Sequence, residues 1–429
     1  MKITKIEAHE ILDSRGNPTL KTTVVLEDGS TGWAAVPSGA STGKYEAHEL
    51  RDKDEKRYLG MGVLKAIDNV HGDIAKVIAG IDAEDQKTLD LKMIETDGTQ
   101  DKSKLGANAI LSVSLSAARA QSTYEKKSLF EHLSKYNPHF DGHYILPIPQ
   151  MNIMNGGRHA NWAVDIQEYM ILPVGAKNVT DAIRMCSEIF HVLQNILKEE
   201  GLATTAGDEG GYAPNLDTNE APLHFISQAV ERAGYVLGKD IYLGMDAAAS
   251  ELKSDGGYWL RKEEKSYSST ELAVIYDQFK SKYPIISMED IFDQDDWESF
   301  KNYTEKNGNL LQIVGDDLYT TNVLRIKKGI ETKATNAVLI KPNQIGTLTE
   351  TIEAILLAKD NNLSAIISHR SGETEDPFIA DLAVAMGCSQ IKTGAPCRSE
   401  RTVKYNRLMH IERKVGDKGT YASFPFHPQ

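Results

Sequence analysis

A chain of 429 residues exceeds what one compact core usually holds, so its length predicts two domains. Apolar residues make up 41% and charged residues 25%, which is ordinary for a water-soluble globular enzyme. The net charge of −13 argues against nucleic acid as a partner, because a phosphate backbone requires a basic face.

The N-terminal third of the chain predicts an α+β region. Residues 3–12 and 19–27 have the pattern of strands, and residues 107–120 carry Ala, Leu and Ser at helical spacing. The first strong cluster of breaker residues after this helix is HFDGHYILPIP, which begins at His139. We therefore expect two domains: an N-terminal α+β capping domain over residues 1–138 and a C-terminal barrel domain over residues 139–429.

A glycine-rich stretch, VPSGASTGKYEAHELRD, covers residues 36–52 and has some likeness to a nucleotide-binding P-loop. Only three residues separate Gly39 from Gly43, where a P-loop has four, and Tyr45 follows Lys44 where a Ser or Thr is required. We therefore reject nucleotide binding and expect a mobile lid, since small residues tolerate large backbone changes.

Beyond residue 139, short apolar runs alternate with amphipathic helical stretches, which predicts parallel strands joined by crossover helices. Each of six successive runs ends on an ionisable residue, and in a parallel barrel such ends meet at one mouth, where active sites lie. The first interval is long enough for a hairpin, GGYWLRKEEK. Six charged strand ends in succession are not explained by solvation. They are Asp246, Glu289, Asp316, Lys341, the His369-Arg370 pair and Lys392.

Three of these residues, Asp246, Glu289 and Asp316, are carboxylates from successive strand ends. Three carboxylates at one mouth would repel one another strongly without a cation. Oxygen ligands with no His or Cys among them favour magnesium, calcium or manganese over zinc. Magnesium also keeps positions open for water and substrate oxygens, so the sequence predicts a site for a hard divalent cation.

Lys341 and Lys392 end two further strands and are candidates for proton abstraction. The reference pKa of lysine is about 10.4, and lowering it by about 3 units costs roughly 4 kcal/mol. Neighbouring magnesium ions and a second lysine would destabilise the charged form in this way, so one of the two lysines can act as a base. The alternative is a pair of surface lysines in salt bridges.

Two loops carry further candidate groups. SHRSGETED contains His369, Arg370 and Ser371, and an arginine and a hydroxyl beside backbone amides suit a phosphate group. GDEGGYAPN places Asp208 and Glu209 on a glycine-flanked loop, where a carboxyl group is a candidate general acid. Two further candidates of the same chemical kinds lie earlier in the chain: His159 and Glu168.

Cysteine usage and the N-terminus bear on location. Cys186, Cys388 and Cys397 form no CxxC pair, so neither a disulfide scaffold nor a thiolate zinc site is expected. The N-terminus MKITKIEAHE has no apolar signal region, and no run reaches the roughly 18 apolar residues of a membrane helix. We expect a cytoplasmic protein with no membrane span; a secondary presence at the cell surface is not readable from the sequence.

Taken together, these motifs resemble the enolase family, and the resemblance covers essentially the whole chain. The matching segments are DSRGNPT (13–19), PSGASTG (37–43), NGGRHA (155–160), the Gln167-Glu168 pair, GDEGGYAPNL (207–216), SMED (287–290), GDDL (315–318), LIKPNQIGTLTET (339–351), SHRSGETED (368–376) and QIKTG (390–394).

The resemblance implies an α/β fold with a C-terminal eight-stranded, TIM-like barrel of the enolase type and an N-terminal α+β domain. It implies a lyase, phosphopyruvate hydratase, that reversibly dehydrates 2-phospho-D-glycerate to phosphoenolpyruvate in glycolysis and gluconeogenesis. It implies two Mg²⁺ ions per active site, the second arriving with substrate. It also implies a homodimer, with an octamer as the alternative assembly.

The resemblance also implies residue roles. The tightly held magnesium would be bound by Asp246, Glu289 and Asp316, and the second ion by Ser41 of the lid. The catalytic groups would be Lys341 as the base at C2 and Glu209 as the acid at the C3 hydroxyl, with Glu168 and His159 beside it. The substrate contacts would be Ser41, His159, Gln167, Glu168, Glu289, Asp316, Lys341 and His369, with Arg370 and Ser371 at the phosphate and Lys392 at the carboxylate.

Three positions depart from the family pattern. Ile291 stands where proline is usual, Pro342 follows the lysine at 341, and Arg158 precedes His159. Pro342 restricts Lys341 to an extended backbone, which suits a strand end. Arg158 would place a positive charge near the mouth and change substrate affinity modestly.

Two other kinds of protein remain as alternatives. A sugar-acid enzyme of the same superfamily would share the carboxylate triad but should lack both the PSGASTG lid and the phosphate loop, which are present here. A non-enzymatic protein on the same scaffold would be indicated by loss of Glu209, Lys341 or a metal carboxylate, and all of these are present.

Overall fold

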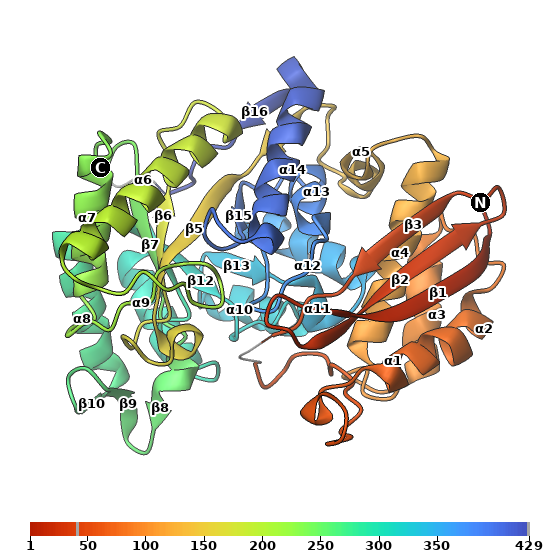
Figure 1. Cartoon of the computed structure of the whole chain (residues 1–429), viewed down its shortest axis with the longest axis horizontal. Coiled ribbons are helices and arrows are strands. Elements are labelled where there is room, and N and C mark those ends of the chain that lie inside the picture. Colours follow the sequence, from red (N-terminus) through yellow and green to blue (C-terminus); the bar gives the residue numbers. More distant parts are fainter. Residues whose placement is uncertain (40–42, 427–429) are drawn as a thin grey trace.

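The structure is a computed structural model that describes residues 1–39 and 43–426. Figure 1 shows two parts side by side: a smaller N-terminal part with a three-stranded sheet, and a larger part in which helices surround a barrel of strands. Within the two described ranges, every helix is too short or too polar to cross a membrane.

The N-terminal part is an antiparallel sheet covered by helices. Its first two strands match the predicted strands to within one residue, and α4 contains the predicted helix. Gly32 lets α4 lie against the sheet, because an added Cβ would come within 2.1 Å of the backbone nitrogen of Ala120. The elements are β1 (Ile3–Leu12), β2 (Pro18–Leu26), β3 (Thr31–Ala35), α1 (Leu64–Asn69), α2 (Ala75–Ile78), α3 (Gln86–Asp97), α4 (Ala107–Tyr124) and α5 (Leu129–Leu133).

Eight strands close into a barrel in the ring order β11, β12, β13, β14, β15, β5, β6, β7. The six runs that were predicted to end on an ionisable residue are β7 and β11 to β15, and all six are mutually parallel, as predicted. The strands are β5 (Ile148–Asn155), β6 (Glu168–Leu172), β7 (Tyr242–Asp246), β11 (Ile285–Glu289), β12 (Gln312–Gly315), β13 (Ala337–Ile340), β14 (Ser364–Ser368) and β15 (Gln390–Lys392).

Strand β6 departs from the predicted parallel pattern, because it runs antiparallel to both β5 and β7. The segment between β5 and β6 contains one short 3-10 helix, Gly157–Ala160, and no crossover helix to bring the chain back. The reversal sets Glu168, the first residue of β6, opposite Asp246 at the end of β7. The start of β6 therefore lies at the barrel mouth together with the C-terminal ends of the parallel strands.

Helices and a small hairpin surround the barrel. The predicted hairpin is present as β9 paired with β10, and Asp165 accepts hydrogen bonds from the amides of Arg261 and Lys262 (2.9 and 3.0 Å), which ties the hairpin to the barrel. The outer elements are α6 (Val179–Glu199), α7 (Ala221–Arg232), α8 (Ser269–Lys282), α9 (Trp297–Asn307), α10 (Val323–Thr332), α11 (Pro342–Ile345), α12 (Leu348–Asp360), α13 (Phe378–Ala385), α14 (Ser399–Val415), β8 (Lys253–Ser254), β9 (Gly257–Leu260), β10 (Lys265–Tyr267), and the pair β4 (Tyr144–Leu146) and β16 (Gly419–Tyr421).

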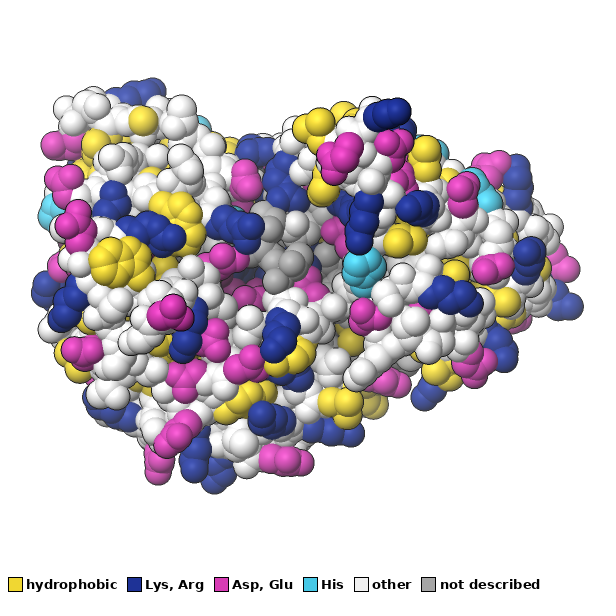
Figure 2. Space-filling view, turned by 90° about the horizontal axis from the view of Figure 1, so that it is seen from below, with side chains coloured by type: hydrophobic (Ala, Val, Ile, Leu, Met, Phe, Trp, Pro, Cys, Tyr) yellow, Lys and Arg dark blue, Asp and Glu magenta, His cyan; other side chains and the backbone are white. Residues whose placement is uncertain are grey.

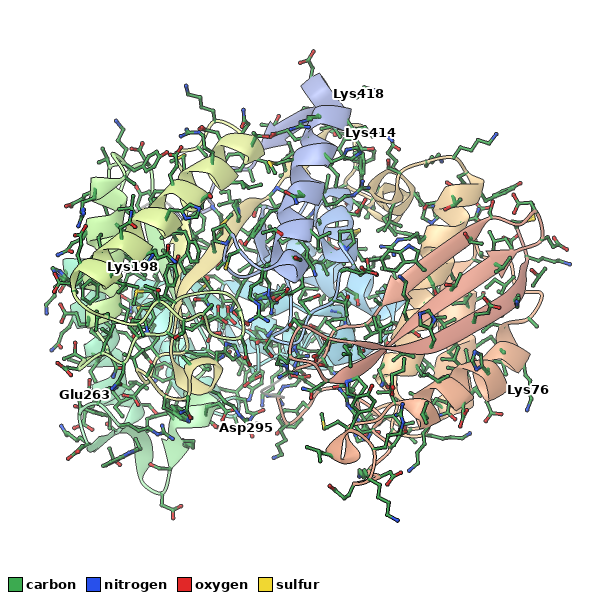
Figure 3. The ribbon with its side chains drawn as sticks, viewed as in Figure 1. Lys76, Lys198, Glu263, Asp295, Lys414 and Lys418 are labelled. Atoms are coloured by element: carbon green, nitrogen blue, oxygen red, sulfur yellow. The ribbon has the colours of Figure 1, made fainter. Side chains whose placement is uncertain are left out.

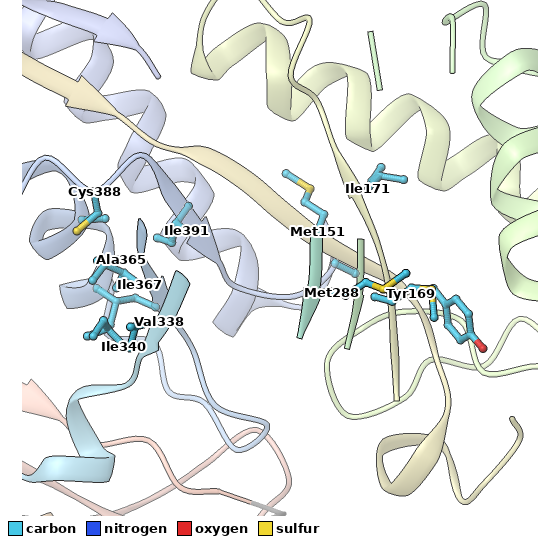
Figure 4. Close-up of a cluster of buried hydrophobic side chains, with 14 of the residues drawn as sticks. Met151, Tyr169, Ile171, Met288, Val338, Ile340, Ala365, Ile367, Cys388 and Ile391 are labelled. Carbon is cyan, nitrogen blue, oxygen red and sulfur yellow. The ribbon is translucent and has the colours of Figure 1, made fainter. Parts of the chain in front are cut away.

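Alternation along the strands separates two apolar layers. Residues such as Val338, Ile340 and Ile367 belong to the large cluster shown in part in Figure 4. The intervening residues Val314 and Leu339 belong to a separate small cluster. Asp316 lies two positions after Val314, and Lys341 lies two positions after Leu339. Because residues two apart on a strand point to the same side, the alternation places both ionisable groups on one side of the sheet.

Most charged side chains lie on the outside of the molecule. The labelled Lys76, Lys198 and Lys418 extend from its periphery in Figure 3. The ionisable groups at the strand ends are the exception, because all of them are buried except Lys341, which is partly buried. Burying a charge is costly unless the charge is paired, so the ion pairs at the strand ends determine which chemistry the barrel mouth can support.

Candidate active site

The predicted strand-end residues other than Glu289 line a pocket at the mouth of the barrel. Figure 2 shows that the surface is hollowed between the two parts of the molecule, with both acidic and basic side chains around the hollow. The predicted residues that line the cavity are His159, Gln167, Glu168, Glu209, Asp246, Asp316, Lys341, His369, Arg370, Ser371 and Lys392. Ser41 lies outside the described residues.

Lys392 sits among three carboxylates. Its Nζ is 2.9 Å from both Oε atoms of Glu289 and 3.1 Å from an oxygen of Glu168 and of Asp246. All four side chains belong to residues that are at most 4% exposed. Burial lowers the pKa of Lys392, but Glu168, Glu289 and Asp246 raise it by more, so the pKa lies well above its usual range. Lys392 is therefore a permanently charged counter-ion.

The third predicted metal ligand, Asp316, is paired with the other lysine. Asp316 contacts Lys341 Nζ directly and accepts a hydrogen bond from Gln344 Nε2 (2.9 Å). Burial lowers the pKa of Lys341, but Asp316 raises it by more, so the pKa is above its usual range. Without a cation, Asp316 therefore stabilises the ammonium form of Lys341, and the lowering expected beside magnesium ions stays a prediction.

Two more carboxylates, which the sequence analysis did not select, surround Asp316. Oxygens of Asp290, Asp316 and Asp317 lie within 4.8 Å of one another. Asp290 accepts the amides of residues 316 and 317 (2.9 and 2.8 Å), so its role is to hold the strand end. Burial, then Asp316, raises the pKa of Asp317 to about 8. Asp290 lies in the SMED motif and Asp317 in the GDDL motif, so these motifs could have identified both residues from the sequence.

This donor set fits a hard divalent cation. Asp246 and Glu289 lie opposite each other at adjacent strand ends and share Lys392, whereas Asp316 lies with Asp290 and Asp317, which add oxygen atoms and no nitrogen or sulfur. Burial, followed by Asp246, raises the pKa of Glu289 well above its usual range, which shows how strongly the carboxylates repel one another. A divalent cation relieves that repulsion, and all-oxygen ligands favour magnesium, calcium or manganese.

On the far side of the mouth, Glu209 is held by three side chains. Asn152 Nδ2 donates to Glu209 Oε2 (3.0 Å), His369 Nε2 lies 3.4 Å from the same oxygen, and His159 Nδ1 lies 3.6 Å from Oε1. Burial raises the pKa of Glu209, but His369 and His159 lower it by more. Asn152 was missed by the sequence analysis, because a polar residue inside a buried strand has no distinctive local pattern.

Glu168 and Glu209 form an acid pair. Their oxygens and a nitrogen of His159 all lie within 4.8 Å of one another. Burial, followed by the charge of Glu209, raises the pKa of Glu168 well above its usual range, whereas the pKa of Glu209 lies well below. When the pKa values of two neighbouring carboxyl groups are driven apart in this way, the pair shares one proton. The group with the higher pKa, which is Glu168, holds that proton.

Residues 368–376, called the phosphate loop after their predicted role, are attached to the N-terminal part. Arg370 NH1 and NH2 lie 2.9 and 3.1 Å from the two carboxylate oxygens of Glu46, and NH1 also donates to Asn343 Oδ1 (3.0 Å). Ser38 and Gly372 exchange backbone hydrogen bonds (2.7 and 2.9 Å). An added Cβ at Gly372 would lie 2.5 Å from Asp13 Oδ2, so only glycine fits here. The sequence analysis missed Glu46.

The departures from the family pattern have local explanations. Lys341 has an extended backbone, with φ −124° and ψ 105°, as its position before Pro342 predicts. Arg158 forms an ion pair with Glu251 (3.0 Å), so its charge is balanced near the mouth. Ile291 is buried in the core. The three cysteines are free thiols, as predicted.

Fold and site together define an α/β-barrel enzyme with a lysine, a carboxylic acid pair and an all-oxygen cation site at one mouth. Two family models match the chain: the enolase N-terminal domain over residues 3–133 and the enolase C-terminal TIM barrel domain over residues 143–428. The chain therefore belongs to the enolase family, and it is a lyase of a metal-dependent family.

Proposed function

We propose that the protein interconverts 2-phospho-D-glycerate and phosphoenolpyruvate with the help of magnesium. The observation that carries this proposal is the placement of a base and an acid on opposite sides of one mouth. Strands β13 and β6 are four places apart in a ring of eight, so Lys341 after β13 faces Glu168 at the start of β6. This placement lets one side take a proton from one carbon while the other side assists loss of the hydroxyl from the next.

Asp246, Glu289 and Asp316 would hold the tightly bound magnesium ion, and Ser41 would contribute to the second. When bound, the ions supply positive charge that stabilises the dianion formed on the substrate carboxylate and weakens the hold of Asp316 on Lys341.

Lys341 would remove the proton from C2. Its backbone amide donates to Thr321 Oγ1 (2.9 Å), which fixes the start of the side chain at the strand end. Burial and the nearby charges of Arg370 and Lys392 all lower the pKa of Lys341, and only the carboxylates raise it. These groups therefore favour a neutral amine when the influence of Asp316 is reduced.

Glu209 would donate a proton to the departing C3 hydroxyl. In the free protein the shared proton is held by Glu168, whose pKa is raised by burial and by Glu209. We propose that the proton moves between the two carboxyl groups, which are within 4.8 Å, and that His159 lies beside the leaving hydroxyl.

The remaining residues would bind the substrate. Arg370 and Ser371 would contact the phosphate, since a guanidinium group and a hydroxyl recognise phosphate oxygens well. Lys392 would contact the substrate carboxylate, which matches its permanent charge. Further contacts would come from Ser41, His159, Gln167, Glu168, Glu289, Asp316, Lys341 and His369.

The direct test is magnesium-dependent formation of phosphoenolpyruvate from 2-phosphoglycerate, followed by ultraviolet absorbance. We expect Lys341→Ala to lower kcat by at least about 10³-fold, because it removes the base. The exposed Lys76→Ala serves as the control and should retain full turnover. Robust turnover in Lys341→Ala would overturn the mechanism. Failure of the unaltered protein with ample magnesium, or turnover of a sugar acid in its place, would overturn the function.

We further propose a cytoplasmic homodimer, with an octamer as the alternative, and a domain boundary between residues 138 and 139. The family matches end at 133 and begin again at 143, which supports that boundary. Free thiols at all three cysteines support a reducing compartment. Light scattering of the purified protein distinguishes dimer from octamer.

A further inference from the structure

Arg401 on α14 is a fully buried cation that the proposed chemistry does not use. Its NH1 lies 2.6 Å from His369 Nδ1 and donates to the carbonyl of Arg370 (2.6 Å). Its NH2 donates to the carbonyls of Ser371 (2.6 Å) and Asp208 (3.1 Å). One side chain therefore connects the phosphate loop to the loop that carries the proposed acid.

The contact with His369 determines where the histidine proton lies. A guanidinium group has only donors, so His369 Nδ1 must accept and must be unprotonated. A neutral imidazole then carries its hydrogen on Nε2. Burial lowers the pKa of His369 to about 4, in keeping with a neutral ring. Arg401 thus selects one of the two tautomers of His369.

The selected tautomer points its N–H at Glu209. His369 Nε2 lies 3.4 Å from Glu209 Oε2, and Asn152 Nδ2 donates to the same oxygen (3.0 Å). The other oxygen, Oε1, faces His159 Nδ1 at 3.6 Å, a nitrogen that makes no hydrogen bond within residues 1–39 and 43–426. His369 Nε2 also makes no hydrogen bond within residues 1–39 and 43–426, so the Asn152 N–H is the bonded donor at Oε2 and the N–H of His369 is a nearby positive partial charge. Together they disfavour a proton on Oε2, which leaves Oε1 to carry it.

We propose that Arg401 is a positioning residue that holds His369 in its Nε2–H form and thereby makes Oε1 the proton-donating atom of Glu209. This inference rests on the proposed role of Glu209 as the acid. The competing explanation is that Arg401 only braces the two loops through their carbonyl groups. The tautomer of His369 distinguishes the two, because bracing alone would not affect it.

Arg398 is a matched control at the start of the same helix. It donates to the carbonyls of Gly207 (3.2 Å) and Ser14 (2.9 Å) and forms an ion pair with Glu400. It therefore braces the Glu209 loop through a carbonyl, as Arg401 does, but its side-chain hydrogen bonds within residues 1–39 and 43–426 do not reach the ring of His369. Replacing either arginine with lysine removes the planar fork and keeps the charge.

The first experiment uses the unaltered protein. Proton-detected nitrogen NMR of protein labelled with ¹⁵N-histidine reports each tautomer, and the signal of His369 is identified by its loss in His369→Gln. We expect an unprotonated Nδ1 and a protonated Nε2, unchanged between pH 8 and about pH 5. A protonated Nδ1, or titration near the ordinary pKa of about 6.5, would overturn the proposal. This measurement is independent of turnover, so it separates failure of the inference from failure of the proposed function.

The second experiment compares variants in the phosphoenolpyruvate assay. We expect Arg401→Lys to lower kcat by about 10- to 100-fold with little change in KM, and to shift the His369 signal toward a mixture of tautomers. Arg398→Lys should leave the His369 signal unchanged and kcat within about 3-fold of the unaltered protein. Equal losses of kcat in both variants with an unchanged His369 signal would show that Arg401 only braces the loops.

A pair of substitutions at His369 provides a further check. Glutamine can place an N–H near the position of Nε2, whereas the shorter asparagine can reach only the position of Nδ1. We therefore expect His369→Gln to retain about 10-fold more kcat than His369→Asn. Greater activity in His369→Asn would contradict donation from Nε2 to Glu209.

Discussion

At the residue scale, one ammonium group is the shared ion-pair partner of three carboxyl groups at the barrel mouth. Lys392 contacts Glu168, Asp246 and Glu289, and all four are buried. Removing one partner of a buried ion pair costs much more than a surface pair contributes, because the remaining charges have neither water nor a counter-ion.

Replacing Lys392 with Met tests this arrangement. We expect the free energy of unfolding to fall by about 3–5 kcal/mol, measured by urea denaturation in the presence of a chelator, because three carboxylates lose their counter-ion. Added magnesium should restore part of the loss. Lys76→Met alters an exposed surface pair and should change stability by less than about 0.5 kcal/mol. Equal effects of the two substitutions would contradict the pairing.

Sequence reasoning identified the residues at the strand ends because periodicity and spacing predict where strands end. It did not predict which charges would pair. Glu46 and Arg370 are 324 positions apart in the chain, and the contact between Arg401 and His369 joins two separate elements. No local pattern encodes such pairs, so Glu46, Asn152 and Arg401 were found only from the structure.

At the element scale, the parallel strands were predictable and the reversal of β6 was not. In β6 the charged Glu168 stands at the start and is followed by the run YMIL, and such a run has the same composition whichever way it points in a barrel. Six other strands carry a charged residue at one end, which gave them a predicted direction. Glu168 was placed at the site only by the family resemblance, and the antiparallel register with β7 explains how it reaches the mouth.

The contact between α3 and α12 makes a prediction about pH. Asp90 on α3 accepts hydrogen bonds from the amide and hydroxyl of Thr349 (2.9 and 2.6 Å), and burial raises its pKa from 3.8 to about 6. A carboxyl group with a raised folded-state pKa contributes stability that is full below pH 3.8 and is lost as the pH rises through about 6.

Asp90→Asn does not titrate, so it isolates this effect. We expect the free energy of unfolding of the unaltered protein, relative to that of Asp90→Asn, to fall by about 1.4 kcal/mol between pH 5 and pH 7.5. Urea denaturation of both proteins at the two pH values measures the difference. A constant or rising difference would mean that Asp90 is not protonated in the folded protein at pH 5.

At the scale of the whole molecule, folding and cation binding are separable. The lysines at the mouth contact the same carboxylates that would bind magnesium, so the chain itself compensates part of their negative charge. Small metal-dependent domains unfold without their ion because they have no such balance and no large core. This chain has an extensive buried core in both parts.

Removal of divalent cations should therefore abolish turnover and leave the fold intact. We expect a chelator to lower Tm by only about 5 °C, with the unfolding transition still cooperative, because a bound ligand at a high multiple of its Kd adds only a few kcal/mol. Calorimetry with and without the chelator measures this, and added magnesium should restore activity. Loss of the cooperative transition would show that the cation is part of the fold.

The attachment of the phosphate loop to the N-terminal part has a consequence for any attempt to reduce the protein to a minimal catalyst. The loop is held by Ser38 through Gly372, by Glu46 through Arg370, and by Arg119 through Asp376 (2.6 Å). A barrel produced alone would keep its lysines and carboxylates but lose the three partners that hold this loop, including Glu46, which contacts Arg370. The two domains, supplied as separate chains, should therefore restore one another's activity when mixed, and neither should be active by itself.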